Sequence, residues 1–128
     1  MQHDVTLEHA FLSIKDLDRT LAFYQKLLPD WVVRWEGRGD AGRWVHFGPA
    51  GDGQPGYLSL SERPAARPFE AYETLGPQHV GFAHADVDGL IARLRPAIEP
   101  SDYVDDGAYR RVYFEDPDGI ELEFVQRL

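Results

Sequence analysis

Residues 9–18 read His-Ala-Phe-Leu-Ser-Ile-Lys-Asp-Leu-Asp, and residues 79–88 read His-Val-Gly-Phe-Ala-His-Ala-Asp-Val-Asp. Both stretches begin with a histidine, continue as a short apolar segment and reach an Asp-containing turn before an amphipathic run. This pattern predicts a strand, a turn and a helix in each copy. The duplication implies that one structural unit occurs twice, so that His9 and His79 occupy equivalent places where they could share a metal ion.

The first copy continues with segments that predict one helix and three more strands. Apolar residues at helical spacing run from Leu17 to Leu28, and Asp16 or Asp18 is a suitable N-cap. Glycine-rich turns separate the alternating segments that follow. The strands of this copy are expected over residues 8–14, 31–36, 43–47 and 57–61.

A linker rich in proline separates the two copies, and one short helical turn is expected in it over residues 69–75. The second copy repeats the order of the first. Its acidic segment 99–107 is rich in turn residues. The elements of this copy are expected at 79–85 (strand), 87–95 (helix), near Ile98 (short strand), 109–114 (strand) and 120–125 (strand).

Together these elements predict an α+β fold made of two βαβββ modules. The modules cover about residues 5–62 and 78–128, joined by the linker 63–77 within a single domain, residues 1–128. Eight strands with helices on one side predict a cupped mixed sheet with its helices on the outer face. Strand alternation turns apolar residues toward the helices and gathers polar and aromatic residues on the cup face. The cup face is expected to carry His9, Phe11, Trp44, His46, Tyr57, Ser59, Tyr109, Arg111, Tyr113, Glu121 and Glu123.

The composition is typical of a soluble globular protein and excludes several classes of function. The chain has 128 residues and a formal net charge of −9, which argues against nucleic-acid binding because phosphate contacts need clustered Lys and Arg. It has no cysteine, which excludes disulfides and thiolate metal sites. Because it shows neither a signal-peptide pattern nor an apolar stretch of membrane-spanning length, we expect a cytoplasmic protein without a membrane partner.

Three motifs carry a family resemblance that covers nearly the whole chain. They are Leu-Glu-His-Ala-Phe-Leu-Ser-Ile-Lys-Asp-Leu-Asp-Arg-Thr-Leu-Ala-Phe-Tyr (7–24), Gln-His-Val-Gly-Phe (78–82) and Phe-Glu-Asp-Pro-Asp-Gly-Ile-Glu-Leu-Glu-Phe (114–124). In this order they resemble the vicinal oxygen chelate superfamily, which holds glyoxalase I, extradiol dioxygenases, methylmalonyl-CoA epimerase and the fosfomycin and bleomycin resistance proteins. The resemblance implies a glyoxalase/dioxygenase-like fold and a small-molecule substrate held by two adjacent oxygens.

The resemblance also implies a metal site. The family's ligand positions fall on His9, His79 and Glu123, whereas the fourth-strand position falls on Ser59, where glyoxalase I-like members supply a carboxylate. This departure counts against a four-ligand site and leaves two histidines and one carboxylate, a set that keeps coordination positions open for substrate and water. One divalent ion per site is implied, with Fe, Mn, Zn, Co and Ni all compatible. The alternative is two strand-end histidines and a surface glutamate.

Further candidates come from the expected cup face. Tyr113 matches an extradiol dioxygenase tyrosine that touches the substrate, and His46 is either a catalytic or substrate-contacting group or a structural histidine. The acid/base histidine of the dioxygenases has no counterpart before Tyr113. Asp105 or Asp106 could take its place, but a solvated acidic turn is the better interpretation of these residues. Arg111 pairs either with a substrate anion or with one of the many acidic side chains. The substrate-binding candidates are Arg111, Ser59, Phe11, Trp44 and Tyr57.

These inferences predict a metal-dependent enzyme of the glyoxalase/dioxygenase superfamily, with lyase, isomerase or dioxygenase chemistry. Two alternatives remain open. A fosfomycin-type resistance transferase would use the same three ligands, although the segment 101–107 lacks a cationic cluster for a phosphonate. A metal-free binding protein for a bleomycin-like drug would suit the net charge of −9. Family members of this length usually pair two chains, so the resemblance also implies a homodimer.

Overall fold

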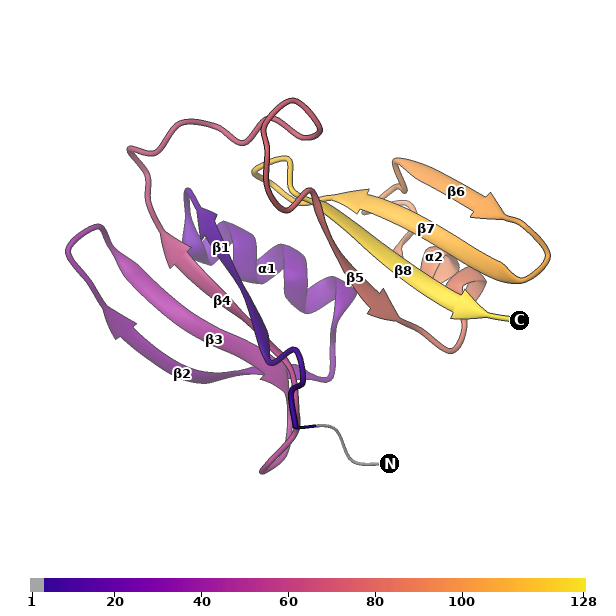
Figure 1. Cartoon of the computed structure of the whole chain (residues 1–128), viewed down its shortest axis with the longest axis horizontal. Helices are drawn as coiled ribbons and strands as arrows, with labels where there is room; N and C mark the ends of the chain where they lie inside the picture. The colour runs from indigo at the N-terminus through magenta and orange to yellow at the C-terminus, as the bar shows by residue number, and fades with distance from the viewer. Residues whose placement is uncertain (1–3) are drawn as a thin grey trace. The chain divides into compact units, whose positions relative to one another are not determined.

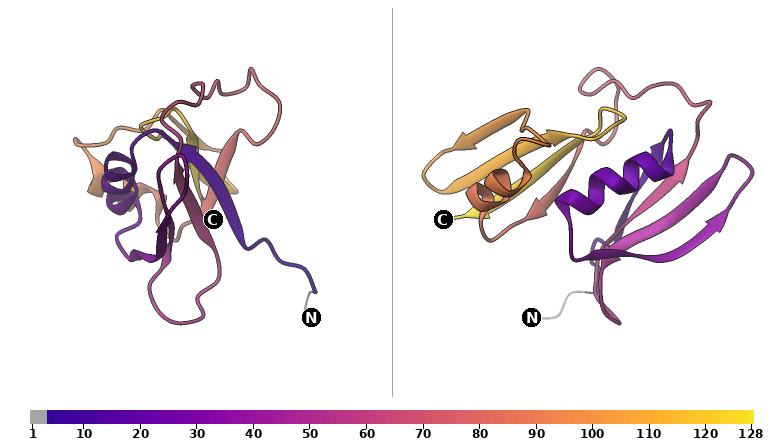
Figure 2. Two further views of the ribbon diagram at one scale, coloured as in Figure 1. Left: turned by 90° about the vertical axis from the view of Figure 1, so that its left-hand side faces the viewer. Right: turned by 180° about the vertical axis from the view of Figure 1, so that it is seen from behind.

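Two sheets of identical topology make up the part of the chain that the structure describes. The structure is a computed structural model; it describes residues 4–128 and divides into two compact units with the boundary after Ala66. Each unit contains one four-stranded mixed sheet and one helix that packs against one of its faces (Figure 1; Figure 2). This arrangement confirms the two predicted βαβββ modules. Within residues 4–128, the helices are too short and too polar to cross a membrane.

The first unit consists of β1 (His9–Ile14), α1 (Leu17–Leu27), β2 (Trp31–Arg38), β3 (Arg43–Pro49) and β4 (Tyr57–Glu62). Its strand order is β1-β4-β3-β2, with β1 and β4 parallel and the other neighbours antiparallel. The parallel pairing sets His9 opposite Tyr57 and Phe11 opposite Ser59. Residues from the two ends of the unit are therefore neighbours on one sheet.

The second unit consists of β5 (His79–Ala83), α2 (Val87–Leu94), β6 (Asp102–Asp105), β7 (Tyr109–Glu115) and β8 (Glu121–Arg127). Its strand order, β5-β8-β7-β6, repeats that of the first unit, with β5 and β8 parallel. The pairing sets His79 opposite Glu121 and Gly81 opposite Glu123. Glu123 thus occupies the position in β8 that Ser59 occupies in β4.

Both helices begin in the same way because the same chemistry is repeated. Asp16 and Asp86 are the N-caps, and each side chain accepts a hydrogen bond from the backbone N–H three residues later. The first N–H of α1 donates to Glu62 Oε2 at 2.9 Å, and the first N–H of α2 donates to Gln126 Oε1 at 2.9 Å. Each helix is therefore tied to the last strand of its own unit.

The turn between β7 and β8 explains the Asp-Pro-Asp-Gly motif. Asp116 is buried, and its Oδ1 accepts hydrogen bonds from the backbone N–H groups of Asp118 and Ile120. Gly119 closes the turn with a φ of 81°, a conformation that costs a glycine little. This turn fixes where β8 starts and hence which of its residues face each side of the sheet.

Burial confirms the predicted alternation along the strands. Most of the apolar residues expected to face the helices are buried, and Ala10 and Leu12 are half-buried. Their neighbours on the other face are more exposed, apart from Ser59 and Glu123. The two cores are built mainly from Ile14, Leu17, Tyr24, Leu27, Val45, Phe47, Leu58 and Leu60 in the first unit, and from Val87, Leu90, Leu94, Val112, Phe114, Leu122 and Phe124 in the second.

Two local predictions differ from the structure. The short strand expected near Ile98 is absent, because the N–H of Ile98 donates to the carbonyl of Leu94 in the turn after α2. The strand lies instead at Asp102–Asp105, within the acidic segment, where it pairs with β7. The segment 69–75 makes a hydrogen-bonded turn at Glu70 but no helix.

Candidate functional site

An imidazole and a carboxylate meet on the sheet of the second unit. His79 begins β5, and Glu123 lies on the adjacent strand β8, with the Nε2 of His79 3.1 Å from the Oε2 of Glu123. Glu123 is only 8% exposed. A glutamate is rarely buried to this degree unless polar partners surround it, and His79 is one such partner.

Arg111 and Tyr113 border this pair from β7. The Nε of Arg111 lies 3.5 Å from the second oxygen of Glu123, Oε1, and its Nη1 lies 2.9 Å from Asp106 Oδ2. Tyr113 is paired with Glu123 in the sheet register, and its ring centroid is 6.4 Å from that of His79. Burial, followed by the negative charge of Glu123, raises the pKa of Tyr113, so its hydroxyl remains protonated at neutral pH.

Asp106 accepts backbone hydrogen bonds in the turn before β7. Backbone N–H groups of Tyr109 and Ala108, together with the Arg111 guanidinium, lower the pKa of Asp106 to about 2. A carboxylate with so low a pKa is a poor proton shuttle near neutral pH. The interpretation of the acidic turn as structural is therefore the better one.

Tyr72 and Glu121 complete the surroundings of His79, and Tyr72 was missed from the sequence. The hydroxyl of Tyr72 donates to Glu121 Oε1 at 2.6 Å, and both groups face the Nδ1 of His79, at 3.5 Å and 3.6 Å respectively. The hydrogen bond to Glu121 raises the pKa of Tyr72 to about 12. Alternation along β8 placed Glu121 on the correct face, but no pattern marks Tyr72, which lies in the linker.

Three rings stand in a row on the sheet of the first unit. Tyr57 lies between His9 and His46, stacked on the first at 4.8 Å and on the second at 4.5 Å. The Nδ1 of His9 lies 3.0 Å from Glu8 Oε1, which also accepts a hydrogen bond from the Tyr57 hydroxyl at 3.3 Å. Burial, followed by the charges of His9 and Arg34, lowers the pKa of His46. His46 is therefore neutral at neutral pH.

Indole and phenyl rings extend this row. Trp44 lies 5.4 Å from His46, and Trp35 from the edge strand β2 packs edge-on against Trp44 at 5.9 Å. Phe11 lies opposite the buried Ser59 and is 53% exposed. The structure thus brings the predicted residues of the first unit together on one sheet face, and the predicted residues of the second unit together on another.

The donor atoms of the second unit fit a metal ion. Two ligands that bind one ion at about 2.0–2.2 Å lie roughly 2.8–3.6 Å apart in tetrahedral or octahedral geometry, and the 3.1 Å separation of His79 Nε2 and Glu123 Oε2 is within this range. His9 belongs to the first unit. Within residues 4–128, no group of three or more His, Asp or Glu side chains is gathered as a metal site.

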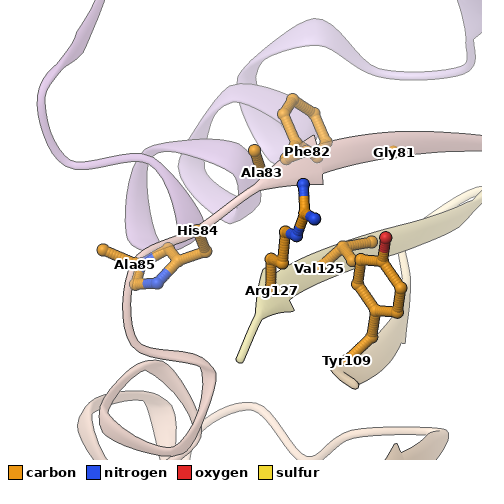
Figure 3. A pocket seen from close by; sticks show the side chains of 8 residues that line it. All are labelled: Gly81, Phe82, Ala83, His84, Ala85, Tyr109, Val125 and Arg127. Carbon is orange, nitrogen blue, oxygen red and sulfur yellow. The ribbon is translucent and has the colours of Figure 1, made fainter.

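An open pocket of about 590 Å³ lies along β5 in the second unit (Figure 3). Its lining includes the small residues Gly81 and Ala83 together with Tyr109, Val125 and Arg127. His84 also lines it, and its Nδ1 accepts a hydrogen bond from the backbone N–H of Asp86, the cap of α2.

Comparison with known proteins identifies the family and the fold of the chain. Residues 6–124 match the family model of the Glyoxalase/Bleomycin resistance protein/Dioxygenase superfamily. A glyoxylase/bleomycin resistance protein/dioxygenase domain from Frankia sp. EAN1pec is 25% identical, with a TM-score of 0.79 over 97% of this chain and 98% of that one. The trypanothione-dependent glyoxalase I of Leishmania major is 25% identical, with a TM-score of 0.76 over 96% and 87% of the two chains.

A genomically encoded fosfomycin resistance protein from Listeria monocytogenes shares the fold. It is 21% identical, with a TM-score of 0.74 over 96% of this chain and 94% of that one. No curated protein matches the chain.

Proposed function

Because the chain belongs to the glyoxalase/bleomycin resistance protein/dioxygenase superfamily, we propose that it is a metal-dependent enzyme acting on a small, oxygen-rich molecule. His79 and Glu123 are two of the proposed ligands, and His9 is the third that the family resemblance assigns. The substrate would be held by two adjacent oxygens. The reaction class is lyase, isomerase or dioxygenase chemistry.

The observation that carries this proposal is the 3.1 Å approach of His79 Nε2 to Glu123 Oε2. A buried carboxylate oxygen beside an imidazole nitrogen is a pair of donor atoms that suits a borderline divalent cation. Arg111 lies near the other carboxylate oxygen, Oε1, and so leaves Oε2 available. Such an ion, when bound, polarises a substrate oxygen and stabilises negative charge that develops on it.

The chain's own residues have complementary tasks in this proposal. Tyr113 keeps its proton because its pKa is raised, so it can donate a hydrogen bond to an oxyanion on the substrate. His46 is neutral because its pKa is lowered, so it can accept a proton at neutral pH. Phe11, Trp44, Tyr57 and Ser59 are proposed to contact the body of the substrate. Arg111 is proposed to hold Glu123 and to contact an anionic substrate group.

Metal-free drug binding is the second candidate, and the ring row of the first unit favours it. Stacked rings at 4.5–4.8 Å with exposed indole and phenyl neighbours form a surface suited to a flat hydrophobic molecule. A binding protein needs no metal, so metal content separates the two candidates.

We further propose that two chains pair as a homodimer, which light scattering coupled to gel filtration would measure directly.

The decisive experiment is elemental analysis of protein made without a metal-affinity tag and incubated with excess Co²⁺ or Zn²⁺ before desalting. We expect a stoichiometric divalent metal in the wild-type protein and its loss in His79→Ala. His84→Ala is the matched control, because this histidine binds the cap of α2 instead. A wild-type protein that retains no metal after this treatment would reject the enzyme proposal in favour of sequestration.

A further inference from the structure

A tyrosine and a glutamate lie on the far side of the His79 imidazole. The hydroxyl of Tyr72 donates to Glu121 Oε1 at 2.6 Å, and that oxygen lies 3.6 Å from His79 Nδ1. The hydroxyl itself lies 3.5 Å from the same Nδ1. The opposite nitrogen, Nε2, faces Glu123 at 3.1 Å. The ring thus has one nitrogen directed at the candidate metal ligand and the other at Tyr72 and Glu121.

The loop that carries Tyr72 is built to hold it. Tyr72 has a φ of 64°, a left-handed conformation that is costly for a large side chain and that persists only where the surroundings impose it. Gln78, the residue before His79, fastens the loop at three points. Its Oε1 accepts from the backbone N–H of Tyr72, and its Nε2 donates to the carbonyls of Thr74 at 2.7 Å and Gly76 at 2.9 Å.

From this geometry we propose that Tyr72 and Glu121 are positioning residues that fix the His79 imidazole so that its Nε2 binds the metal ion. The inference rests on the proposed metal-dependent function. Histidine ligands generally engage a carboxylate or similar group through the second ring nitrogen, which fixes the tautomer and the ring orientation. Tyr72 restrains the Glu121 carboxylate through its hydroxyl, and the Gln78-fastened loop restrains Tyr72.

The first unit contains the same combination from different sequence positions. The Nδ1 of His9 lies 3.0 Å from Glu8 Oε1, and the hydroxyl of Tyr57 donates to that oxygen at 3.3 Å. In the second unit the glutamate comes from β8 and the tyrosine from the linker, whereas in the first the glutamate precedes β1 and the tyrosine comes from β4. Two histidines at equivalent positions therefore acquire the same Tyr–Glu support by unrelated routes.

The test is a Co²⁺ titration of the full chain by calorimetry, combined with the electronic absorption spectrum of the Co²⁺-saturated protein. We expect Tyr72→Phe to raise the dissociation constant about 10–100-fold, the effect usual for a partner of a metal-bound histidine, and to change the spectrum at saturation. Tyr103→Phe is the matched control, since it removes a tyrosine–carboxylate hydrogen bond to Asp88 in the same unit. It should leave both readouts at the wild-type values.

The proposal is overturned if Tyr72→Phe keeps the wild-type affinity and spectrum, or if Tyr103→Phe weakens binding equally. Should Tyr72→Phe fail to fold, Glu121→Gln decides by the same criteria, because its amide can present a donor to His79 Nδ1 where the carboxylate presents an acceptor. If the wild-type protein binds no Co²⁺, the proposed function fails. The ¹⁵N signals of the metal-free His79 ring then decide alone: a change in Tyr72→Phe supports positioning, and no change overturns it.

Discussion

Glu62 links α1 to the sheet of the first unit, so replacing it should lower the free energy of unfolding. The loss can be judged by comparing two variants at this position, Glu62→Ala and Glu62→Gln. Its Oε2 accepts the N–H of Leu17 at 2.9 Å, and its Oε1 accepts the N–H of Arg43 at 2.9 Å. Glu62→Ala leaves both donors without an acceptor. Leu17 is buried, so its N–H costs about 1–3 kcal/mol when unpaired. The N–H of Arg43 is half-buried and adds about 1 kcal/mol, for a loss of about 2–4 kcal/mol in all.

Glu62→Gln provides the comparison, because Gln126 already occupies the equivalent position in the second unit and accepts the first N–H of α2. A single amide oxygen can serve Leu17 but not Arg43 as well, so we expect a loss of only about 1 kcal/mol. Urea unfolding followed by tryptophan fluorescence measures both variants. All three tryptophans lie within residues 31–44, so the signal reports the first unit. If Glu62→Ala and Glu62→Gln lowered the free energy of unfolding equally, the reasoning would be refuted.

Two further outcomes test the second unit. Phe124→Ala removes a ring that is 1% exposed and packs on Phe82 at 5.0 Å and Phe114 at 5.9 Å, so the free energy of unfolding measured in urea by circular dichroism should fall by about 3–5 kcal/mol. Because the pKa of Asp106 is lowered from 3.8 to about 2, its charge stabilises the fold fully above about pH 4 and ceases to do so as the pH falls through about 2. The stability difference between the wild-type protein and Asp106→Asn should shrink over this interval, and a difference independent of pH would contradict the assignment.

The elements that could be predicted from the sequence are those whose pattern reflects burial. The helices and most of the long strands alternate or repeat because one face of each packs on a core, and their predicted positions agree with the structure. The edge strand β2 is the exception, since none of its residues is fully buried. The strand Asp102–Asp105 has four exposed residues and no apolar face, so it leaves no such pattern. It pairs with β7 through backbone hydrogen bonds, which form whatever the side chains are and therefore leave no pattern in the sequence.

The candidate site likewise has one part that could be predicted from the sequence and one part that depends on the folded structure. Alternation placed Glu123 on the cup face, but its approach to His79 at 3.1 Å depends on the parallel register of β5 and β8, which only the folded sheet determines. Tyr72 lies in the linker, has a left-handed backbone conformation itself, and donates its backbone N–H to the side chain of Gln78. A contact made in this way depends on tertiary structure, so no periodicity or spacing could reveal it.

The two copies differ at the strand position proposed to supply a carboxylate to the metal, which is Glu123 in β8 and Ser59 in β4. In β8 Glu123 lies opposite Gly81, where an added Cβ would meet no other atom within 4 Å, so the space beside the carboxylate is open. In β4 the equivalent residue is Ser59, and the residue opposite it is Phe11, a large ring. A carboxylate therefore pairs with a glycine in the second unit, whereas a hydroxyl pairs with a large ring in the first. Two equal metal sites would need a carboxylate at this position in both units, so the strand carboxylate of the proposed metal site is present in the second unit alone.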